Sequence, residues 1–456
     1  MFETELPAFQ SDIQEVISAM DAGELKIKHL FSHKDGKIVN TVVINGKAYA
    51  YGNYVGVFDD KIIEKRIIKR YAKLSMYKAL SLYLGKTLPW GALTGIRPTK
   101  LAYAQIEETG DFKDFFINKM KVSEEKTSLV EKVIDTQKGV YEKDPNNTDF
   151  FVFVPFCPTR CEYCSFISSD MRTARKYVDA YVDTLVREIR ESAKYVKKLR
   201  SIYVGGGTPV ALPDDKLALI LNELDKINTG VEYTVEAGRP DAITKENLAL
   251  LKSHGVTRIC INPQTMNDQT LAQIGRKHTA KDVIEKFELA RGMFSINSDL
   301  IAGLAGETAE DFKRTLDAVA GLDPDGITVH TLCLKRGSHL SEEVERLSER
   351  ETGQMVSYAL DSLGQKGYSP YYLYRQKYSA GNLENVGYCK SGKQCVYNVD
   401  VMEEISRNVA CGANAISKEG RNNFELINRS ANPKDVPTYI GSIEKLLDNK
   451  RKLFEN

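Results

Sequence analysis

The sequence has few features of a secreted, membrane-spanning or nucleic-acid-coating protein. Its 456 residues include only eight cysteines, too few for a scaffold held together by disulfides. It has 63 Lys and Arg against 62 Asp and Glu, a balance that argues against a chain built to coat nucleic acid or anionic membranes. The first residues lack a basic stretch followed by an apolar one, and no apolar run reaches the roughly 18 residues that span a bilayer. We expect a cytoplasmic protein that binds no nucleic acid and does not span a membrane.

The composition predicts a folded chain of several domains. Apolar residues make up 42% of the chain and charged residues 27%, which is typical of globular proteins. The Pro and Asn cluster at 144–148 marks a boundary. We expect an α+β extension over 1–145, a core of alternating strands and helices over 146–340, and a mainly helical cap over 341–456.

The first 145 residues combine two kinds of pattern. Residues 37–58 read as short antiparallel strands joined at an Asn-Gly turn. Apolar residues then recur at three and four over 61–84, and a second helical pattern covers about 123–138.

Beyond residue 145 the chain repeats one rhythm of strand and helix. Helix-like segments separate six short apolar strands, and this alternation predicts a parallel sheet with α/β architecture. Six such units indicate a partial (βα)6 barrel related to the TIM barrel. The predicted strands cover 150–155, 201–204, 231–235, 258–261, 295–301 and 326–329.

Polar and cysteine side chains gather where these strands end. In a parallel sheet the working residues lie at the carboxyl ends of the strands, because the loops there are free to carry side chains. In strand order, these positions hold CPTRCEYC, GGGTP, Glu236, Asn262 with Gln264, Asp299 and His330.

Cys157, Cys161 and Cys164 have the spacing C-x3-C-x2-C. This spacing fits a 4Fe-4S cluster in which each thiolate binds one iron, and the fourth iron stays open to the amino and carboxylate groups of S-adenosylmethionine. A structural zinc site is one alternative, but it needs four ligands and no second C-x2-C pair is present. Three ordinary core cysteines are the other alternative.

The glycines at 205–207 and the acidic side chain of Glu236 are compatible with a nucleoside ligand. Glycine lets a ligand approach the backbone, and a strand-end carboxylate can accept hydrogen bonds from ribose hydroxyls. A plain strand-to-helix turn and a solvated glutamate explain the same residues. Taken singly, Gln264, Arg276 and Asp299 read as surface or satisfied polar residues.

Several segments together carry a resemblance to a known family. PFCPTRCEYCSF, GGGTP, TVEAGRPD, INPQTMNDQTLAQIGRKH and DLIAGLAGET resemble the radical S-adenosylmethionine superfamily, in its oxygen-independent coproporphyrinogen III oxidase branch. LPWGALTGIRPTK and YYLYRQKYSAGNLENVGY resemble the HemZ-type members of that branch. The resemblance covers nearly the whole chain and implies a radical SAM barrel.

The resemblance also implies ligands and their binding residues. Cys157, Cys161 and Cys164 would hold a 4Fe-4S cluster. Gly206 and Glu236 match positions that contact the S-adenosyl-L-methionine bound to it, and Leu332 falls near a position where the family makes a backbone contact. Phe151 stands where the proven oxidases have a contacting tyrosine. The positions that match those lining a second such molecule are Tyr163, Gly207, Thr208, Gln264, Arg276 and Asp299.

The activity implied is the oxygen-independent conversion of coproporphyrinogen III to protoporphyrinogen IX. An electron from a low-potential donor, such as flavodoxin or ferredoxin, would release a 5'-deoxyadenosyl radical. The radical would take hydrogen from a propionate group, which then loses carbon dioxide and becomes a vinyl group.

Two departures from the oxidase pattern leave other activities open. Phe151 lacks the hydroxyl of the oxidases' tyrosine, and Phe166 replaces a fourth cysteine. Phenylalanine at 166 is shared with haem chaperones and with anaerobic haem-modifying methyltransferases. A haem carrier would need an axial ligand, for which His278 and His330 are the candidates near the expected site. The tyrosines after 365 either line a tetrapyrrole cavity or pack as a cap.

Overall fold

The computed structural model describes residues 1–455 except 59, 96, 165–168, 334–348 and 377–381. The chain forms two compact units, Met1–Lys132 with Arg375–Lys377 and Val133–Tyr374 with Tyr378–Asn456. The domain limits expected at 145 and 340 stay a prediction. No helix among the described residues combines the length and the apolar character that crossing a bilayer requires.

The first unit contains a four-stranded sheet in the order β1-β2-β3-β4. Its first pair is parallel and the other two are antiparallel. The turn between β3 and β4 has positive φ at Asn45 and Gly46, as tight hairpin turns require. The hairpin predicted from the sequence is confirmed. The strands are β1 (Phe2–Thr4), β2 (Ile27–Lys34), β3 (Lys37–Ile44) and β4 (Lys47–Tyr54).

Helices complete the first unit, and their ends follow capping rules. The carboxylate of Asp60 accepts hydrogen bonds from the first turn of α2, which ends at Gly85 with φ of 65°. Trp90 is buried, and the guanidinium of Arg375 lies 5.2 Å from its ring centroid. The only tryptophan is therefore a packing residue. The helices are η1 (Pro7–Phe9), α1 (Gln10–Ala19), α2 (Lys61–Leu84), α3 (Pro98–Thr109), η2 (Phe115–Lys119) and α4 (Glu124–Gln137).

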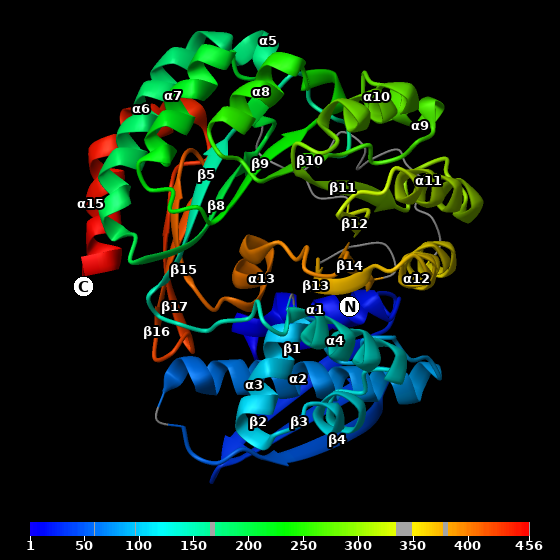
Figure 1. Ribbon diagram of the computed structural model, residues 1–456. Helices are drawn as coiled ribbons and strands as arrows, with labels where there is room; N and C mark the ends of the chain where they lie inside the picture. Colours follow the sequence, from blue (N-terminus) through cyan, green and yellow to red (C-terminus); the bar gives the residue numbers. More distant parts are fainter. Residues whose placement is uncertain (59, 96, 165–168, 334–348, 377–381, 456) are drawn as a thin grey trace. The chain divides into compact units, whose positions relative to one another are not determined.

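The second unit is built on an 11-stranded sheet, in the order β13-β14-β12-β11-β10-β9-β8-β5-β15-β16-β17 (Figure 1). Its centre contains the six predicted strands, and each pairs in parallel with the next. The α/β class and the six parallel strands are confirmed. These strands are β5 (Asn147–Val154), β8 (Lys198–Gly206), β9 (Glu232–Gly238), β10 (Arg258–Ile261), β11 (Ser295–Ala302) and β12 (Gly326–Thr331).

Amphipathic helices connect these strands and bury their apolar faces against the sheet. In α6 the buried stripe includes Tyr181, Leu185 and Ile189, at the three-and-four spacing of a helix face. Figure 1 shows α6, α7 and α8 next to one another along β5, β8 and β9. The connecting elements are α5 (Met171–Ala174), η3 (Arg175–Tyr177), α6 (Val178–Ser192), η4 (Ala193–Tyr195), η5 (Pro209–Ala211), α7 (Asp214–Asp225), η6 (Pro240–Ala242), α8 (Lys245–Ser253), α9 (Asp268–Gln273), α10 (Ala280–Ala290) and α11 (Ala309–Gly321).

The segment expected to be a mainly helical cap also adds strands to this sheet. β15 pairs in parallel with β5, and β14 pairs antiparallel with β12. Both additions cover strands that would otherwise be open edges. The elements are α12 (Glu349–Gln365), β13 (Ser369–Arg375), β14 (Glu384–Cys389), α13 (Val396–Glu403), β15 (Arg407–Cys411), β16 (Ile416–Arg421), β17 (Leu426–Ala431), α14 (Val436–Gly441) and α15 (Ile443–Glu455).

Candidate functional site

The three motif cysteines lie on one loop after β5. Cys157 ends the short strand β6 (Phe156–Cys157), which pairs with β7 (Ser169–Asp170). Cys161 is buried, and Cys157 and Cys164 are half-buried. Among the described residues, no three His, Cys, Asp or Glu side chains are gathered as they would be around a single metal ion. A 4Fe-4S cube does not need such convergence, because each thiolate binds a different corner.

The glycine segment after β8 runs directly against the cysteine loop. The backbone N–H of Gly207 donates to Val154 O at 2.8 Å, and that of Thr208 donates to Phe156 O at 2.7 Å. A Cβ on Gly207 would lie 2.6 Å from Phe156 O and 3.0 Å from the sulfur of Cys157. The sequence suggested glycine here for the approach of a ligand. The structure shows that the chain's own cysteine loop already requires it.

Glu236, in β9, is a half-buried carboxylate at the end of the sheet where the cysteines lie. The hydroxyl of Tyr203 donates to its Oε1 at 2.6 Å, and the N–H of Gly206 donates to its Oε2 at 3.2 Å. Burial, and to a lesser degree the negative charge of Asp299, raise the pKa of Glu236 to about 7. The carboxylate is therefore poised between its two protonation states near neutral pH.

Gln264 and Asp299 meet through the backbone of neighbouring segments. The N–H of Gln264 donates to Asp299 O, and the N–H of Ile301 donates to Gln264 O, each at 3.0 Å. Gln264 has φ of 71°, a left-handed conformation that is costly for a residue with a side chain and often marks functional sites. The carboxylate of Asp299 accepts from Asn297 at 2.9 Å and lies 3.8 Å from Nε2 of His330.

Arg276 is buried beside the cysteine loop, and two of its nitrogens have no hydrogen-bond partner among the described residues. Its Nη2 donates to the hydroxyl of Tyr163 at 2.6 Å. Burial raises the pKa of Tyr163, so this hydroxyl stays protonated. The Nε and Nη1 of Arg276 are buried and have no hydrogen-bond partner in the structure. Unsatisfied cationic donors of this kind fit an anionic ligand group such as a carboxylate.

A second buried arginine, Arg239, was not found from the sequence. It directly follows β9, and its Nη1 donates to both the carbonyl and the hydroxyl oxygen of Thr159, each at 2.8 Å. Burial alone would raise the pKa of Asp241, but Arg239 and His278 hold it well below the usual range. An Arg two residues before an Asp in a loop is a common pattern, and no sequence signal indicates that it reaches the cysteine motif 80 positions earlier.

Phe151 belongs to a stack of rings rather than to a polar network. Its ring lies 5.7 Å from that of Tyr397, and Tyr397 lies 4.3 Å from Tyr203. Tyr203 is also the hydroxyl donor to Glu236. The ring at position 151 thus supports the residue that holds the carboxylate, although it has no hydroxyl of its own. Phe166, the other departure from the oxidase pattern, lies outside the described residues.

The two histidine candidates differ in exposure. The side chain of His278 is 0% exposed, and its Nδ1 lies 3.9 Å from the carboxylate of Asp241. The side chain of His330 is 28% exposed, and its Nδ1 lies 3.0 Å from the hydroxyl of Tyr374. Only His330 is accessible as an axial haem ligand without rearrangement of the core.

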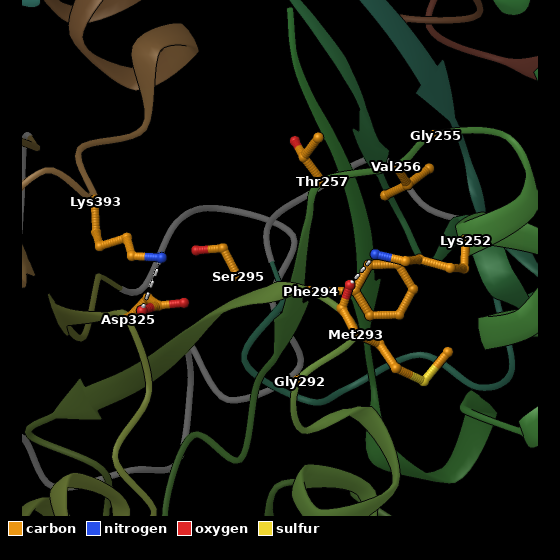
Figure 2. A pocket seen from close by; sticks show the side chains of 10 residues that line it. All are labelled: Lys252, Gly255, Val256, Thr257, Gly292, Met293, Phe294, Ser295, Asp325 and Lys393. Atoms are coloured by element: carbon orange, nitrogen blue, oxygen red, sulfur yellow. Dashed lines mark hydrogen bonds and ion pairs between the residues drawn. The ribbon is translucent and has the colours of Figure 1, made fainter. Parts of the chain in front are cut away.

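A pocket of about 590 Å³ lies at the opposite end of the strands (Figure 2). It is lined by Thr257, Ser295 and Asp325, at the amino ends of β10, β11 and β12. Lys252 and Lys393 also line it, and Figure 2 shows both paired with neighbouring groups. None of the candidate residues contributes to this pocket.

Comparison with known families and proteins gives a consistent result. Residues 151–319 match the family model of the radical SAM superfamily. The chain is 35% identical over 440 residues to the oxygen-independent coproporphyrinogen-III oxidase-like protein HemZ of Bacillus subtilis, covering 91% of this chain and 88% of that protein. It is 33% identical over 193 residues to the heme chaperone HemW of the same organism, covering 41% of this chain and 50% of HemW.

The fold is shared with a solved structure. Coproporphyrinogen III oxidase (HemN) from Escherichia coli, a radical SAM enzyme, superposes with a TM-score of 0.52 at 21% identity, covering 67% of this chain and 71% of HemN. At this identity the likeness concerns the fold alone. It confirms the α/β architecture inferred from the strand rhythm.

Proposed function

The chain belongs to the radical SAM superfamily, among the HemZ-like relatives of the oxygen-independent coproporphyrinogen III oxidases, and on that premise we propose that it decarboxylates coproporphyrinogen III. In this reaction two propionate side chains become vinyl groups, giving protoporphyrinogen IX without oxygen. The similarity to HemZ over most of both chains supports the substrate class. A flavodoxin or ferredoxin is the proposed electron donor.

The cofactors that this superfamily implies are a 4Fe-4S cluster and S-adenosylmethionine. We propose Cys157, Cys161 and Cys164 as the cluster ligands. When bound, these groups supply radical chemistry that removes hydrogen from an unactivated carbon. The residues proposed to contact S-adenosylmethionine are Phe151, Tyr163, Gly206, Gly207, Thr208, Glu236, Gln264, Arg276 and Asp299. The residues 146–340 are the proposed catalytic core, with an extension before it and a cap after it.

One observation supports this proposal more than any other. Glu236 offers a half-buried acceptor and Arg276 offers two buried donors without partners, both at the carboxyl ends of the parallel strands. S-adenosylmethionine carries ribose hydroxyls that donate to a carboxylate and a carboxylate that accepts from a guanidinium. The site therefore has a group complementary to the ribose and a group complementary to the carboxylate of such ligands.

The other residues of the site bind, orient and exclude water. Tyr203 and the N–H of Gly206 fix both oxygens of Glu236, so the carboxylate meets its ligand without reorganising. Tyr163 holds the guanidinium of Arg276 through Nη2, which leaves Nε and Nη1 for the ligand. The stacked rings of Phe151, Tyr397 and Tyr203 hold in place the tyrosine that donates to Glu236.

The direct test is product analysis under anaerobic conditions. Reconstituted protein receives reductant, S-adenosylmethionine and coproporphyrinogen III, and the porphyrinogen products are identified by mass spectrometry. Loss of carbon dioxide from the propionates is expected, in step with formation of methionine and 5'-deoxyadenosine. Formation of 5'-deoxyadenosine with unchanged substrate would overturn the proposed reaction.

A haem-binding role is the second candidate, supported by the similarity to HemW and by the partly exposed His330. A haem titration of the purified protein distinguishes it from the first. Stoichiometric binding with a Soret shift that is lost in His330→Ala would favour a carrier. Haem supplied in place of coproporphyrinogen in the turnover assay distinguishes a third activity, methylation with ring opening, by the mass of the product.

A further inference from the structure

Arg239 connects the end of β9 to the cysteine loop. The residue is buried, with 4% of its surface exposed. Nη1 donates to the carbonyl and hydroxyl oxygens of Thr159 and lies 3.8 Å from the sulfur of Cys161. A guanidinium is a rigid fork of donors with a permanent positive charge. One nitrogen therefore contacts both the backbone and a sulfur of the proposed cluster loop.

The carboxylate of Asp241 pairs with the other two nitrogens of this guanidinium. Nε of Arg239 donates to Oδ1 of Asp241 at 2.9 Å, and Nη2 donates to Oδ2 at 2.7 Å. This two-point pairing occupies one side of the fork and turns Nη1 toward Thr159 and Cys161. All three nitrogens of Arg239 therefore have partners within the protein. In this it differs from Arg276, whose Nε and Nη1 lack partners.

The cysteine loop is held at a second place by the segment that precedes Arg276. The N–H of Glu162 donates to Ile274 O at 3.2 Å, and Tyr163 bonds to Arg276 at 2.6 Å. The loop is thus fixed on one side of Cys161 by Arg239 and on the other by residues 274–276. Of these anchors, only Arg239 brings a cationic N–H to a cysteine sulfur.

We propose that Arg239 is a positioning residue that sets both the geometry and the reduction potential of the cluster held by Cys157, Cys161 and Cys164. The inference rests on the proposed function. Hydrogen bonds to cysteine sulfur and nearby positive charge favour the reduced state of an iron–sulfur cluster, because reduction adds negative charge. Arg239 brings a permanent positive charge to within 3.8 Å of the Cys161 sulfur, and its two short hydrogen bonds hold Thr159, two residues earlier in the loop.

The two roles are separated by two substitutions. Arg239→Gln removes the positive charge, so the midpoint potential of the cluster is expected to shift to a more negative value. Arg239→Lys keeps the charge but loses the fork, so the potential is expected to stay near that of the wild type while a chelator removes iron several-fold faster. Arg407→Lys is the matched control, because Arg407 is a buried arginine bonded to Glu419 and to Tyr195 O instead of the cysteine loop.

The measurements are iron and sulfide per chain, redox titration followed by electron paramagnetic resonance, and the rate of iron loss to a chelator. Thermal melting of the apoproteins shows whether each variant folds. If Arg239→Gln does not fold, the rate at which Arg239→Lys loses iron to the chelator decides the test. Wild-type potential in Arg239→Gln together with wild-type lability in Arg239→Lys would overturn this inference alone. A wild-type protein that assembles no cluster would overturn the proposed function, and this inference with it.

Discussion

Charged side chains lie at both ends of the parallel strands β8 to β12, but in different surroundings. At the carboxyl ends Glu236 is half-buried and accepts from Tyr203, and Arg276 has two buried donors without partners. At the amino ends the pocket of about 590 Å³ contains two lysines, both engaged: Lys252 donates to Met293 O at 2.6 Å, and Lys393 lies 3.5 Å from Asp325. The two lysines of this pocket have partners, whereas two nitrogens of Arg276 have none among the described residues.

This comparison teaches that an open pocket and a buried cation without partners need not coincide in one sheet. Burying a cationic donor without a partner costs free energy, and a bound ligand can recover that cost. A surface lysine that already has a partner carries no comparable penalty. The predictions below test whether binding and chemistry belong to the carboxyl ends alone.

The largest effect is expected from the motif cysteines. Replacing Cys157, Cys161 or Cys164 by Ala removes one cluster ligand, and we expect loss of most bound iron and of all turnover. Iron and sulfide per chain after anaerobic reconstitution provide the measurement. Cys389→Ala is the control, because Cys389 is a core cysteine with 1% exposure and its loss should leave iron content unchanged. Equal iron loss in the control would contradict the assignment.

The next largest effect is expected at Gly207. An alanine Cβ there would collide with Phe156 O and approach the sulfur of Cys157, so Gly207→Ala should destabilise the protein by about 1–3 kcal/mol and lower its cluster content. Gly321→Ala is the matched control, since nothing lies within 4 Å of a Cβ at that position. Chemical denaturation and iron analysis compare the two variants. A stable Gly207→Ala with full cluster content would disprove the tight approach.

A moderate, pH-dependent effect is expected at Glu236. With its pKa at about 7, the carboxylate ionises as pH rises from 6 to 8 and becomes a stronger acceptor for ribose hydroxyls. The affinity for S-adenosylmethionine should therefore rise about tenfold over this range, and Glu236→Gln should abolish the dependence. Calorimetric titration at each pH measures it. Parallel pH curves for the wild type and the variant would show that Glu236 does not contact the ligand.

A smaller effect on stability is expected from Asp149, which lies in β5 away from the candidate site. Burial raises its pKa to about 7, although hydrogen bonds from Ser201 and Ser406 act in the opposite direction. Because the unfolded value is about 3.9, the protonated native state is favoured. The contribution of Asp149 to the free energy of unfolding is complete below about pH 4 and is lost as the pH rises to about 7. The Tm should fall over this range, and Asp149→Asn should make the fall shallower. An equally steep fall in the variant would refute the assignment.

The smallest effect is expected at the amino-end pocket. Lys252→Ala and Lys393→Ala each remove the lysine from one surface contact, which typically lowers the free energy of unfolding by less than about 1 kcal/mol. Binding of S-adenosylmethionine and turnover should stay within about twofold of the wild type, as measured by the assays above. A tenfold loss in either variant would show that the two ends of the sheet do not differ as described.

The strand rhythm was predictable because buried parallel strands are short apolar runs between amphipathic helices. Segments such as 258–261 and 326–329 matched β10 and β12 closely. The strand β15 was missed, since five consecutive buried residues have no periodicity that distinguishes a strand from a buried helix. What decides its conformation is the open edge of β5, which is distant in sequence.

The candidate site was predictable only where residues are adjacent in sequence. The cysteines share one loop, so their spacing carries the chemistry. Arg239 and Tyr203 act on groups far along the chain, namely Thr159 and Glu236, and the sequence contains no trace of those contacts. Conversely, the sequence suggested that Gly207 lets a ligand approach the backbone, whereas a side chain there would first meet atoms of Phe156 and Cys157.

The pairing of β5 with β15 has a consequence for biosynthesis. Ser406 and Asp149, which bond within this part of the sheet, are separated by 257 positions, so the strand that leads into the cysteine loop keeps one edge open until the ribosome has made β15 (Arg407–Cys411). Such a long delay favours slow, late folding and leaves an apolar strand exposed to aggregation or chaperones in the meantime. Until then the proposed cluster loop is attached to an incomplete sheet, and a cluster delivered to the nascent chain would meet a site that is not yet fully supported.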